Sequence, residues 1–174
     1  MSFVPKSEWL KDVRDINLYL PPTYCIEGFS TWLMEGRMIA DEHWKEFGNR
    51  QDIRIFNMDY AKYLALDAAG KLLSCTARRE GTLIGYLVFF LIPDTHASGG
   101  RMAESAFYYT VPCPTRGIIL RGMIRHAVRR LLDDGVQYIR FRHRLRQTAQ
   151  PILENIGFVL DEYSYSLDET KFRR

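Results

Sequence analysis

The stretch that decides the fold runs from residue 72 to residue 92 and reads LLSCTARREGTLIGYLVFFLI. Residues 72–79 and 82–92 are rich in strand-forming side chains, and Glu80-Gly81 between them is typical of a tight turn. We therefore expect a β-hairpin. The second arm is apolar on both faces, which predicts a strand in the centre of a sheet that is covered on both sides.

Further strands and helices are expected on the C-terminal side of this hairpin. Residues 102–111 form a third strand rich in aromatic residues, which Pro112 and Pro114 stop. A long helix follows, and its apolar stripe consists of Ile119, Leu120, Met123, Ile124, Ala127, Val128, Leu131 and Leu132. Asp133-Asp134-Gly135 closes this helix. A strand over 136–144, a short helix over 148–155 and a final strand over 158–167 complete the chain.

The N-terminal part is expected to be helical. After the break at Pro21-Pro22, the apolar spacing predicts two short amphipathic helices across 27–48, interrupted at Gly36. Asp59 caps a further helix that ends near Gly70. We expect one α/β domain over 1–174, with a helical part at 1–70 and a core at 71–168. The core is a mixed, mostly antiparallel twisted sheet with helices on both faces.

Composition and cysteine spacing exclude several classes of protein. The chain has 174 residues, 47% of them hydrophobic, which is typical of a folded domain. It has no apolar run long enough to span a membrane. The charged N-terminus leaves no room for a secretory signal, so we expect a cytoplasmic protein. Cys25, Cys75 and Cys113 lie far apart and away from histidines, which predicts neither a metal site nor a disulfide framework.

Charge is distributed unevenly along the chain. Residues 1–113 carry a net charge of −2, residues 114–146 carry +7, and residues 147–174 carry −2. The middle segment is the candidate for binding an anion. Within it, an alternating row of arginines must face solvent, acidic side chains, or an anion such as coenzyme A or nucleic acid. The row consists of Arg140, Arg142, Arg144 and Arg146.

The start of the long helix is a candidate phosphate site. Residues 111–118 connect a strand to the helix, so several backbone N–H groups are free at a positive helix end. Arg116 and Arg121 flank this end and can donate charge-assisted hydrogen bonds to phosphate oxygens. An ordinary helix start with solvated arginines is the alternative explanation.

The order of several short motifs resembles the GNAT superfamily of acyl-coenzyme A-dependent acetyltransferases, especially its phage-encoded branch. The resemblance covers residues 71–168, and Glu42-His43-Trp44 is similar to a segment of the phage-type members. The motifs are Glu80-Gly81-Thr82-Leu83-Ile84-Gly85-Tyr86, Tyr109-Thr110-Val111, Arg116-Gly117, Gly135-Val136 and Ile152-Leu153-Glu154-Asn155-Ile156-Gly157-Phe158.

The resemblance implies transfer of an acetyl group from acetyl-coenzyme A directly to an amine, without a metal. The pantetheine arm is expected between the strands at 102–111 and 136–144, and the pyrophosphate at the turn from Arg116 to Arg121. The implied cofactor-binding residues are Tyr109, Val111, Arg116, Gly117, Ile118, Ile119, Arg121 and Gly122. The chain departs from the family pattern at Ile119 and Arg121, where the family has small residues, and at Leu153, where many members have a tyrosine.

Three residues are candidates for acid–base catalysis. Glu104 can take a proton from the amine, Tyr109 can hydrogen-bond the thioester or the leaving thiolate, and His96 titrates near neutrality. Glu42 and His43 on the N-terminal helix are candidates for binding the acceptor. Packing or solvation explains each of these residues as well, so both interpretations stay open.

Two further hypotheses remain open at this point. A catalytically weakened GNAT-like module would bind nucleic acid or an acidic protein partner through the basic segment at 116–146. An interaction domain would self-associate through Trp9, Trp32 and Trp44, for which core packing is the alternative. The sequence leaves the acceptor and the oligomeric state undetermined.

Overall fold

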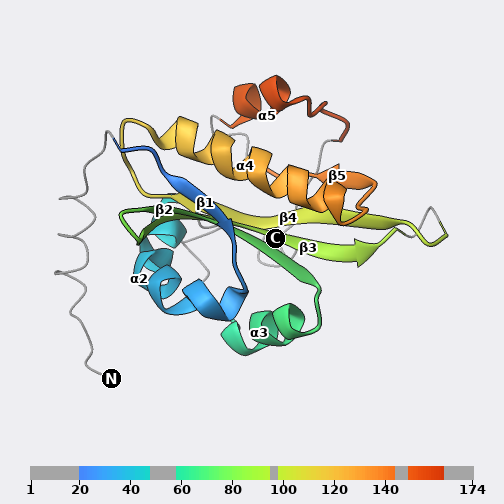
Figure 1. Cartoon of the computed structure of the whole chain (residues 1–174), viewed down its shortest axis with the longest axis horizontal. Helices are drawn as coiled ribbons and strands as arrows, with labels where there is room; N and C mark the ends of the chain where they lie inside the picture. Colours follow the sequence, from blue (N-terminus) through green and yellow to red (C-terminus); the bar gives the residue numbers. More distant parts are fainter. Residues whose placement is uncertain (1–19, 48–57, 95–97, 144–148, 163–174) are drawn as a thin grey trace, which may run out of the picture.

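A five-stranded sheet with helices on both faces forms the protein, and the computed structural model describes it over residues 20–47, 58–94, 98–143 and 149–162 (Figure 1). The elements are β1 (Thr23–Ile26), α2 (Phe29–Phe47), α3 (Tyr60–Ala68), β2 (Leu72–Arg79), β3 (Thr82–Pro93), β4 (Arg101–Thr110), α4 (Arg116–Asp133), β5 (Tyr138–Arg140) and α5 (Gln150–Ile156). The strand order is β1-β2-β3-β4-β5, and only the β4–β5 pair is parallel. The predicted mixed, mostly antiparallel sheet with helices on both faces is confirmed.

The β2–β3 hairpin has the turn that the sequence predicts. Arg79 pairs with Thr82, and the turn residues Glu80 and Gly81 have positive φ angles of 52° and 82°. Two consecutive positive φ angles are typical of the turns that match the twist of a hairpin. Glycine adopts such an angle without strain, which explains its place in this turn.

Side chains of β3 alternate between the two faces of the sheet. A Cβ atom added to Gly85 would lie 3.2 Å from Met123 of α4, whereas the neighbouring Tyr86 stacks on Trp32 of α2 with 4.9 Å between the ring centroids. Alternation then directs Leu87 and Phe89 to the α4 face. All these β3 residues are buried, as expected for a central strand.

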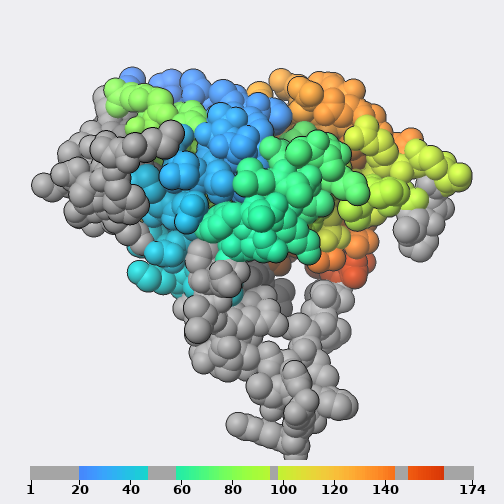
Figure 2. Space-filling view, turned by 90° about the horizontal axis from the view of Figure 1, so that it is seen from below, coloured from blue at the N-terminus to red at the C-terminus, as the bar shows by residue number. Residues whose placement is uncertain are grey.

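The helices α2 and α3 cover one face, and α4 covers the other with α5 packed on it (Figures 1 and 2). The predicted cap of α3 is present, since an Asp59 carboxylate oxygen accepts a 3.0 Å hydrogen bond from the backbone N–H of Lys62. The predicted stripe of α4 is buried at Ile119, Leu120, Met123, Ile124, Ala127 and Leu131, and Leu132 is exposed. No helix of the described residues is long and apolar enough to cross a membrane.

The interruption predicted at Gly36 is wrong, because α2 is one continuous helix of 19 residues. A Cβ atom at Gly36 would lie 2.5 Å from the ring of Trp32. The glycine therefore makes room for a buried tryptophan and does not end the helix. Trp32 is a core residue, in agreement with the packing interpretation of that tryptophan.

The C-terminal elements differ in part from the prediction. β5 pairs with β4 only over three residues, Tyr138–Arg140, where a strand over 136–144 was expected. The short helix is present as α5. The strand expected over 158–167 is absent at 158–162, and its remainder lies outside the described residues. β1 was not predicted, because its four residues are too few to show a periodic pattern.

Candidate active site

The pairing of β4 with β5 extends over only three residues. Met102, Ala103 and Glu104 pair with β5, and the Oγ of Ser105 then accepts a 2.7 Å hydrogen bond from the backbone N–H of Arg142. A β-bulge in the β3–β4 pairing follows at Val88/Phe89. Beyond it, residues 107–110 of β4 continue their pairing with β3, past the last residue of β4 that pairs with β5.

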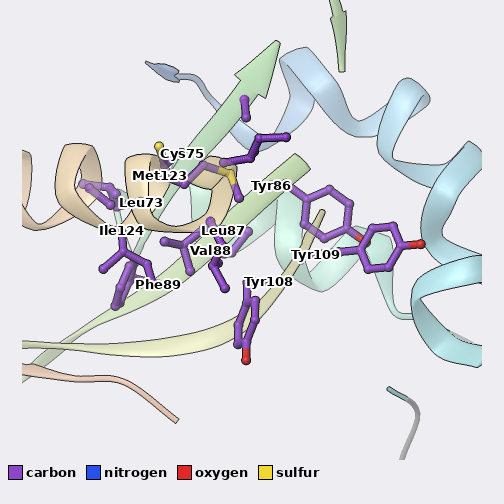
Figure 3. Packing of buried hydrophobic residues seen from close by; sticks show 14 of the residues in the cluster. Leu73, Cys75, Tyr86, Leu87, Val88, Phe89, Tyr108, Tyr109, Met123 and Ile124 are labelled. Carbon is purple, nitrogen blue, oxygen red and sulfur yellow. The ribbon is translucent and has the colours of Figure 1, made fainter. Parts of the chain in front are cut away.

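An aromatic cluster lies where this part of β4 faces α2. Tyr86 and Tyr109, which are neighbours in the β3–β4 register, project in the same direction, away from Met123 and Ile124 (Figure 3). The ring of His43 stacks on Tyr109 with 5.1 Å between the centroids and an interplanar angle of 15°. The Nδ1 atom of His43 lies 2.8 Å from the hydroxyl oxygen of Tyr86. The structure thus brings together the predicted residues His43 and Tyr109.

Burial keeps the two tyrosines of this cluster protonated. Burial raises the pKa of Tyr86 well above its ordinary value of 10, and the nearby Tyr109 and Tyr60 raise it further. Burial also raises the pKa of Tyr109 to about 12, with an additional contribution from Glu46 and an opposing one from Arg116. Both phenols are therefore neutral hydrogen-bonding groups at neutral pH.

Arg116 joins α4 to both α2 and β4. Its Nη2 donates a 3.0 Å hydrogen bond to Glu46, its Nη1 forms an ion pair with the same carboxylate, and its Nε donates a 3.0 Å bond to the Oγ1 of Thr110. The guanidinium lies over the ring of Tyr109 at 5.4 Å. The predicted cofactor residue Arg116 is thus held beside the aromatic cluster by a bidentate pair.

The N-terminus of α4 is positive and has no counter-charge of its own. Its first turn carries no acidic residue, and Thr115 makes no side-chain capping bond. The side chain of Arg79 of β2 extends to the start of α4, where its Nη2 lies 3.4 Å from the Oγ1 of Thr115. Arg79 is 3% exposed, and its Nε has no hydrogen-bond partner in the described part of the chain. This combination favours an anion.

The other residues predicted to bind the cofactor lie around the same turn but differ in exposure. Val111, next to the turn, is buried, and its N–H bonds to Ile84. Gly117, Ile118 and Arg121 are exposed. Ile119 is fully buried against the sheet, so its side chain leaves the solvent side of the helix start open.

Gly122 has a packing contact that the sequence analysis did not foresee. A Cβ atom there would lie 2.1 Å from the Tyr24 side chain of β1. The missing side chain therefore allows β1 to approach α4 closely, and a role of Gly122 in cofactor binding stays a prediction.

Glu104 binds arginine side chains in this structure. Its Oε2 lies 3.0 Å from Nη2 of Arg142 and 3.7 Å from Nη1 of Arg140. Arg140 also pairs with Glu162 at 3.4 Å. Two members of the predicted arginine row thus face acidic side chains, while Arg144, Arg146 and the candidate base His96 lie outside the described residues.

Two polar residues of this region were missed in the sequence analysis, namely Tyr86 and Arg79. Each has a signal in the sequence, because Tyr86 is the one hydroxyl-bearing residue in the apolar run 83–92 and Arg79 ends a strand that is otherwise mostly apolar. Their partners come from other elements, so the signal alone does not reveal a site. No group of metal-ligating side chains occurs within the described ranges.

Solved structures of similar fold are described as acetyltransferases, several of them as N-acetyltransferases. One is the ribosomal-protein-alanine N-acetyltransferase from Brucella melitensis biovar Abortus 2308, at 14% identity and a TM-score of 0.67 over 86% of this chain and 98% of that one. A predicted acetyltransferase with acetyl-CoA from Clostridium acetobutylicum is 17% identical, with a TM-score of 0.65 and coverages of 87% and 98%. AAC(6')-Iy in complex with a bisubstrate analogue is also 17% identical, with a TM-score of 0.65 and coverages of 86% and 99%.

No protein-family model and no curated protein sequence matches the chain. The agreement in fold over nearly the whole length of these structures confirms the predicted GNAT-like fold.

Proposed function

We propose that the protein is an acetyl-coenzyme A-dependent N-acetyltransferase, which transfers an acetyl group directly to an amine. The observation that carries the proposal is the positive start of α4 with the buried Arg79 beside it, within a fold shared with N-acetyltransferases. Two of the similar solved structures are described with acetyl-CoA or with an analogue that contains coenzyme A.

The residues at the start of α4 fit the anionic part of acetyl-coenzyme A. The first-turn N–H groups of Gly117 and Ile118 have no helical carbonyl to bond, and both residues are exposed. Arg121 is exposed next to them, and Arg79 adds buried positive charge with an unsatisfied N–H. A pyrophosphate at this place would satisfy these donors and balance the charge. Arg116 lies at the same turn and would hold it in place for the pyrophosphate through its bonds to Glu46 and Thr110.

The acceptor amine would lie on the α2 side of β4. Glu42 and His43 are half-buried there, and Glu46 is near them on the last turns of α2. Carboxylates attract a cationic amine, and the neighbouring aromatic rings favour it through cation–π contact. A small amine, a protein lysine or N-terminus, and a modified nucleobase all remain candidates for the acceptor.

The chemistry requires an activated acyl group and a neutral amine. The thioester of acetyl-coenzyme A supplies the acyl group when it is bound. The chain must hold the two reactants in contact, bind the developing oxyanion and remove a proton from the amine. Glu104, His96 and Tyr109 remain sequence-based candidates for these roles, although the pairing of Glu104 with two arginines favours a structural role for it.

Calorimetric titration with acetyl-coenzyme A tests the proposal before an acceptor is known. We expect saturable one-to-one binding by the wild type and an affinity about tenfold lower for Arg116→Ala, because the bonds to Glu46 and Thr110 that hold the start of α4 are lost. Arg125→Ala is the matched control, since Arg125 is exposed two turns further along α4. A folded sample that fails to bind millimolar acetyl-coenzyme A would contradict the proposal.

Several parts of the sequence analysis stay predictions. These are the single domain over 1–174, the cytoplasmic location and the resemblance to phage-encoded members, which implies action in a host cell. The alternative of a nucleic-acid or acidic-partner module also stays untested, and the pairing of Arg140 and Arg142 with acidic residues weakens the charge that it relies on. The titration with acetyl-coenzyme A distinguishes the two hypotheses, because a module that binds nucleic acid or an acidic partner has no need to bind acetyl-coenzyme A.

A further inference from the structure

The solvent face of α4 carries three arginines in a straight row, which we call the α4 ridge. It consists of Arg121, Arg125 and Arg129, and all three residues are exposed. Because successive residues of the ridge are four positions apart, they lie on one face of the helix and extend along it for about 12 Å. The opposite face of α4 is the apolar stripe that packs on the sheet.

No acidic side chain balances the charge of the α4 ridge within the described residues. None of its three arginines forms an ion pair or a side-chain hydrogen bond there, and α4 has no acidic residue before its last position. The other two arginines of the helix differ, since Arg116 pairs with Glu46 and Arg130 pairs with Asp134 at 2.9 Å. The α4 ridge is thus a local excess of three positive charges that is open to solvent.

The helices α4 and α2 have opposite net charges. α4 carries five arginines and one aspartate, a net charge of +4, whereas α2 carries four acidic and two basic residues, a net charge of −2 with histidine neutral. The two helices lie on different faces of the sheet (Figure 1). An anionic macromolecule is therefore attracted to the α4 side and repelled from the α2 side.

We propose that the α4 ridge docks the phosphate backbone of a nucleic-acid duplex and does so without reading its sequence. Arginine suits this partner, because its guanidinium group donates two parallel N–H groups to phosphate oxygens. Interfaces with nucleic acids are also more positive than interfaces between proteins, whose centres are depleted in charged residues. The α4 ridge has charges throughout, and the exposed apolar residues Ile118 and Leu132 lie only beyond its ends. This arrangement favours a nucleic acid over an acidic protein.

The packing of α4 explains why the contact is made with the backbone. The sheet covers one side of the helix, α5 packs on it, and a Cβ atom at Gly122 would lie 2.1 Å from Tyr24 of β1. A helix that reads bases must enter the major groove, and these neighbours prevent α4 from doing so. A duplex is favoured over a single strand because it presents about twice as many phosphates per unit length. In addition, the α4 ridge has no aromatic side chain on which an unpaired base stacks.

Docking of a nucleic acid does not require the proposed enzymatic activity. Arg125 and Arg129 lie outside the residues assigned to acetyl-coenzyme A, and only Arg121 belongs to both groups. The tests therefore change Arg125 and Arg129 together and leave Arg121 intact.

Fluorescence anisotropy with a labelled DNA duplex of about 20 base pairs measures this binding. Three phosphate contacts predict that the logarithm of the association constant falls with the logarithm of the salt concentration with a slope of about −2.7. The double variant Arg125→Gln/Arg129→Gln should make the slope shallower by about 1.8 and weaken the affinity by about tenfold or more at about 50 mM salt. A second duplex of different sequence should give the same slope and affinity.

The matched control is Lys62→Gln/Lys71→Gln, which removes the same charge from two exposed residues, on α3 and just before β2. It should change the affinity for the duplex by less than about twofold. An equal loss in the two double variants would overturn the proposal, because the net charge alone would then account for the binding. Tighter binding of a polyglutamate peptide than of the duplex, or no binding of the duplex at about 50 mM salt, would also overturn it.

Titration of Arg125→Gln/Arg129→Gln with acetyl-coenzyme A separates docking from the proposed function. We expect wild-type affinity for the cofactor, which also shows that the variant is folded. A parallel loss of affinity for both ligands would assign these arginines to the cofactor site and overturn the docking proposal alone. A wild type that binds the duplex but not acetyl-coenzyme A would instead contradict the proposed function and support docking as a separate property of α4.

Discussion

The two faces of the sheet are built from different kinds of side chain. On the α4 face, the aliphatic side chains of Leu87, Met123 and Ile124 and the ring of Phe89 are fully shielded from solvent. On the α2 face, Tyr86 and Tyr109 add aromatic rings with polar tips and point toward α2 (Figure 3). The α4 face contributes to stability through burial, whereas the α2 face also presents hydroxyl groups that can form hydrogen bonds.

Ion pairs also distinguish the α2 face. Arg78 donates hydrogen bonds to Glu27 at 2.8 and 3.0 Å and to Glu35 at 2.8 and 2.9 Å, and so ties β1, β2 and α2 together. The hydrogen bond from Arg78 lowers the pKa of Glu27, although burial opposes the change. The Glu46–Arg116 pair holds the other end of α2 in the same way. On this face, directional ion pairs therefore add to the apolar contacts that hold α2 on the sheet.

The largest effect is expected on the free energy of unfolding, when a buried side chain on the α4 face is shortened. Leu87→Ala removes a side chain that is fully buried and should lower the free energy of unfolding by about 3 kcal/mol, through lost burial and the cavity left behind. Urea unfolding measures this change. Leu132→Ala, on the exposed side of α4, is the control and should change stability by less than about 0.5 kcal/mol.

The affinity of Leu87→Ala for acetyl-coenzyme A adds a second readout. If this face serves stability alone, the affinity stays within about twofold of the wild type at a temperature where the variant is folded. A large loss of affinity without unfolding would show that the two faces are coupled more closely than their composition indicates.

The sequence predicts the elements with strong local patterns and misses those that depend on distant contacts. The β2–β3 hairpin and α4 were predicted because alternation and helical periodicity persist over many residues. The division of α2 was wrong because Gly36 has the same appearance in the sequence whether it ends a helix or accommodates Trp32. The extent of β5 depends on its pairing with β4, which no local pattern specifies.

The same distinction applies to the candidate site. His43 and Tyr109 were identified from their chemistry and from a family resemblance, and the structure places their rings in contact. Tyr86 was missed because its significance comes from a hydrogen bond between residues 43 positions apart. The role of Glu104 was equally invisible, since the arginines that bind it belong to β5 and to the residues after it.

A smaller change in the free energy of unfolding is expected at alkaline pH from Tyr109 on the α2 face. The pKa of Tyr109 is about 12 in the folded protein and about 10 when unfolded. As the pH rises from 10 to 12, the unfolded chain loses this proton and the folded one keeps it, so this group lowers the free energy of unfolding by about 1.4 kcal/mol per pH unit. Tyr109→Phe should make the decline shallower in urea unfolding at pH 9, 10 and 11.

The range below pH 9 provides an internal control for that experiment. There Tyr109 is protonated in both states, so wild type and Tyr109→Phe should lose or gain stability with the same slope. A difference confined to pH below 9 would mean that another group is responsible, and equal slopes above pH 10 would contradict the raised pKa.

The smallest effect concerns Glu104, which lies on the α2 face of β4 and is bound by Arg140 and Arg142. These pairs are partly exposed, so Glu104→Gln should lower the free energy of unfolding by less than about 1 kcal/mol. If Glu104 serves only to hold the end of β5 against β4, kcat for acetylation of a test amine such as spermidine or tyramine stays within about twofold of the wild type. A decrease of about 100-fold, with the pH dependence of kcat/KM lost, would instead make Glu104 the general base. It would also show that the proton leaves the amine beside the arginines of β5 and not beside the aromatic cluster of α2.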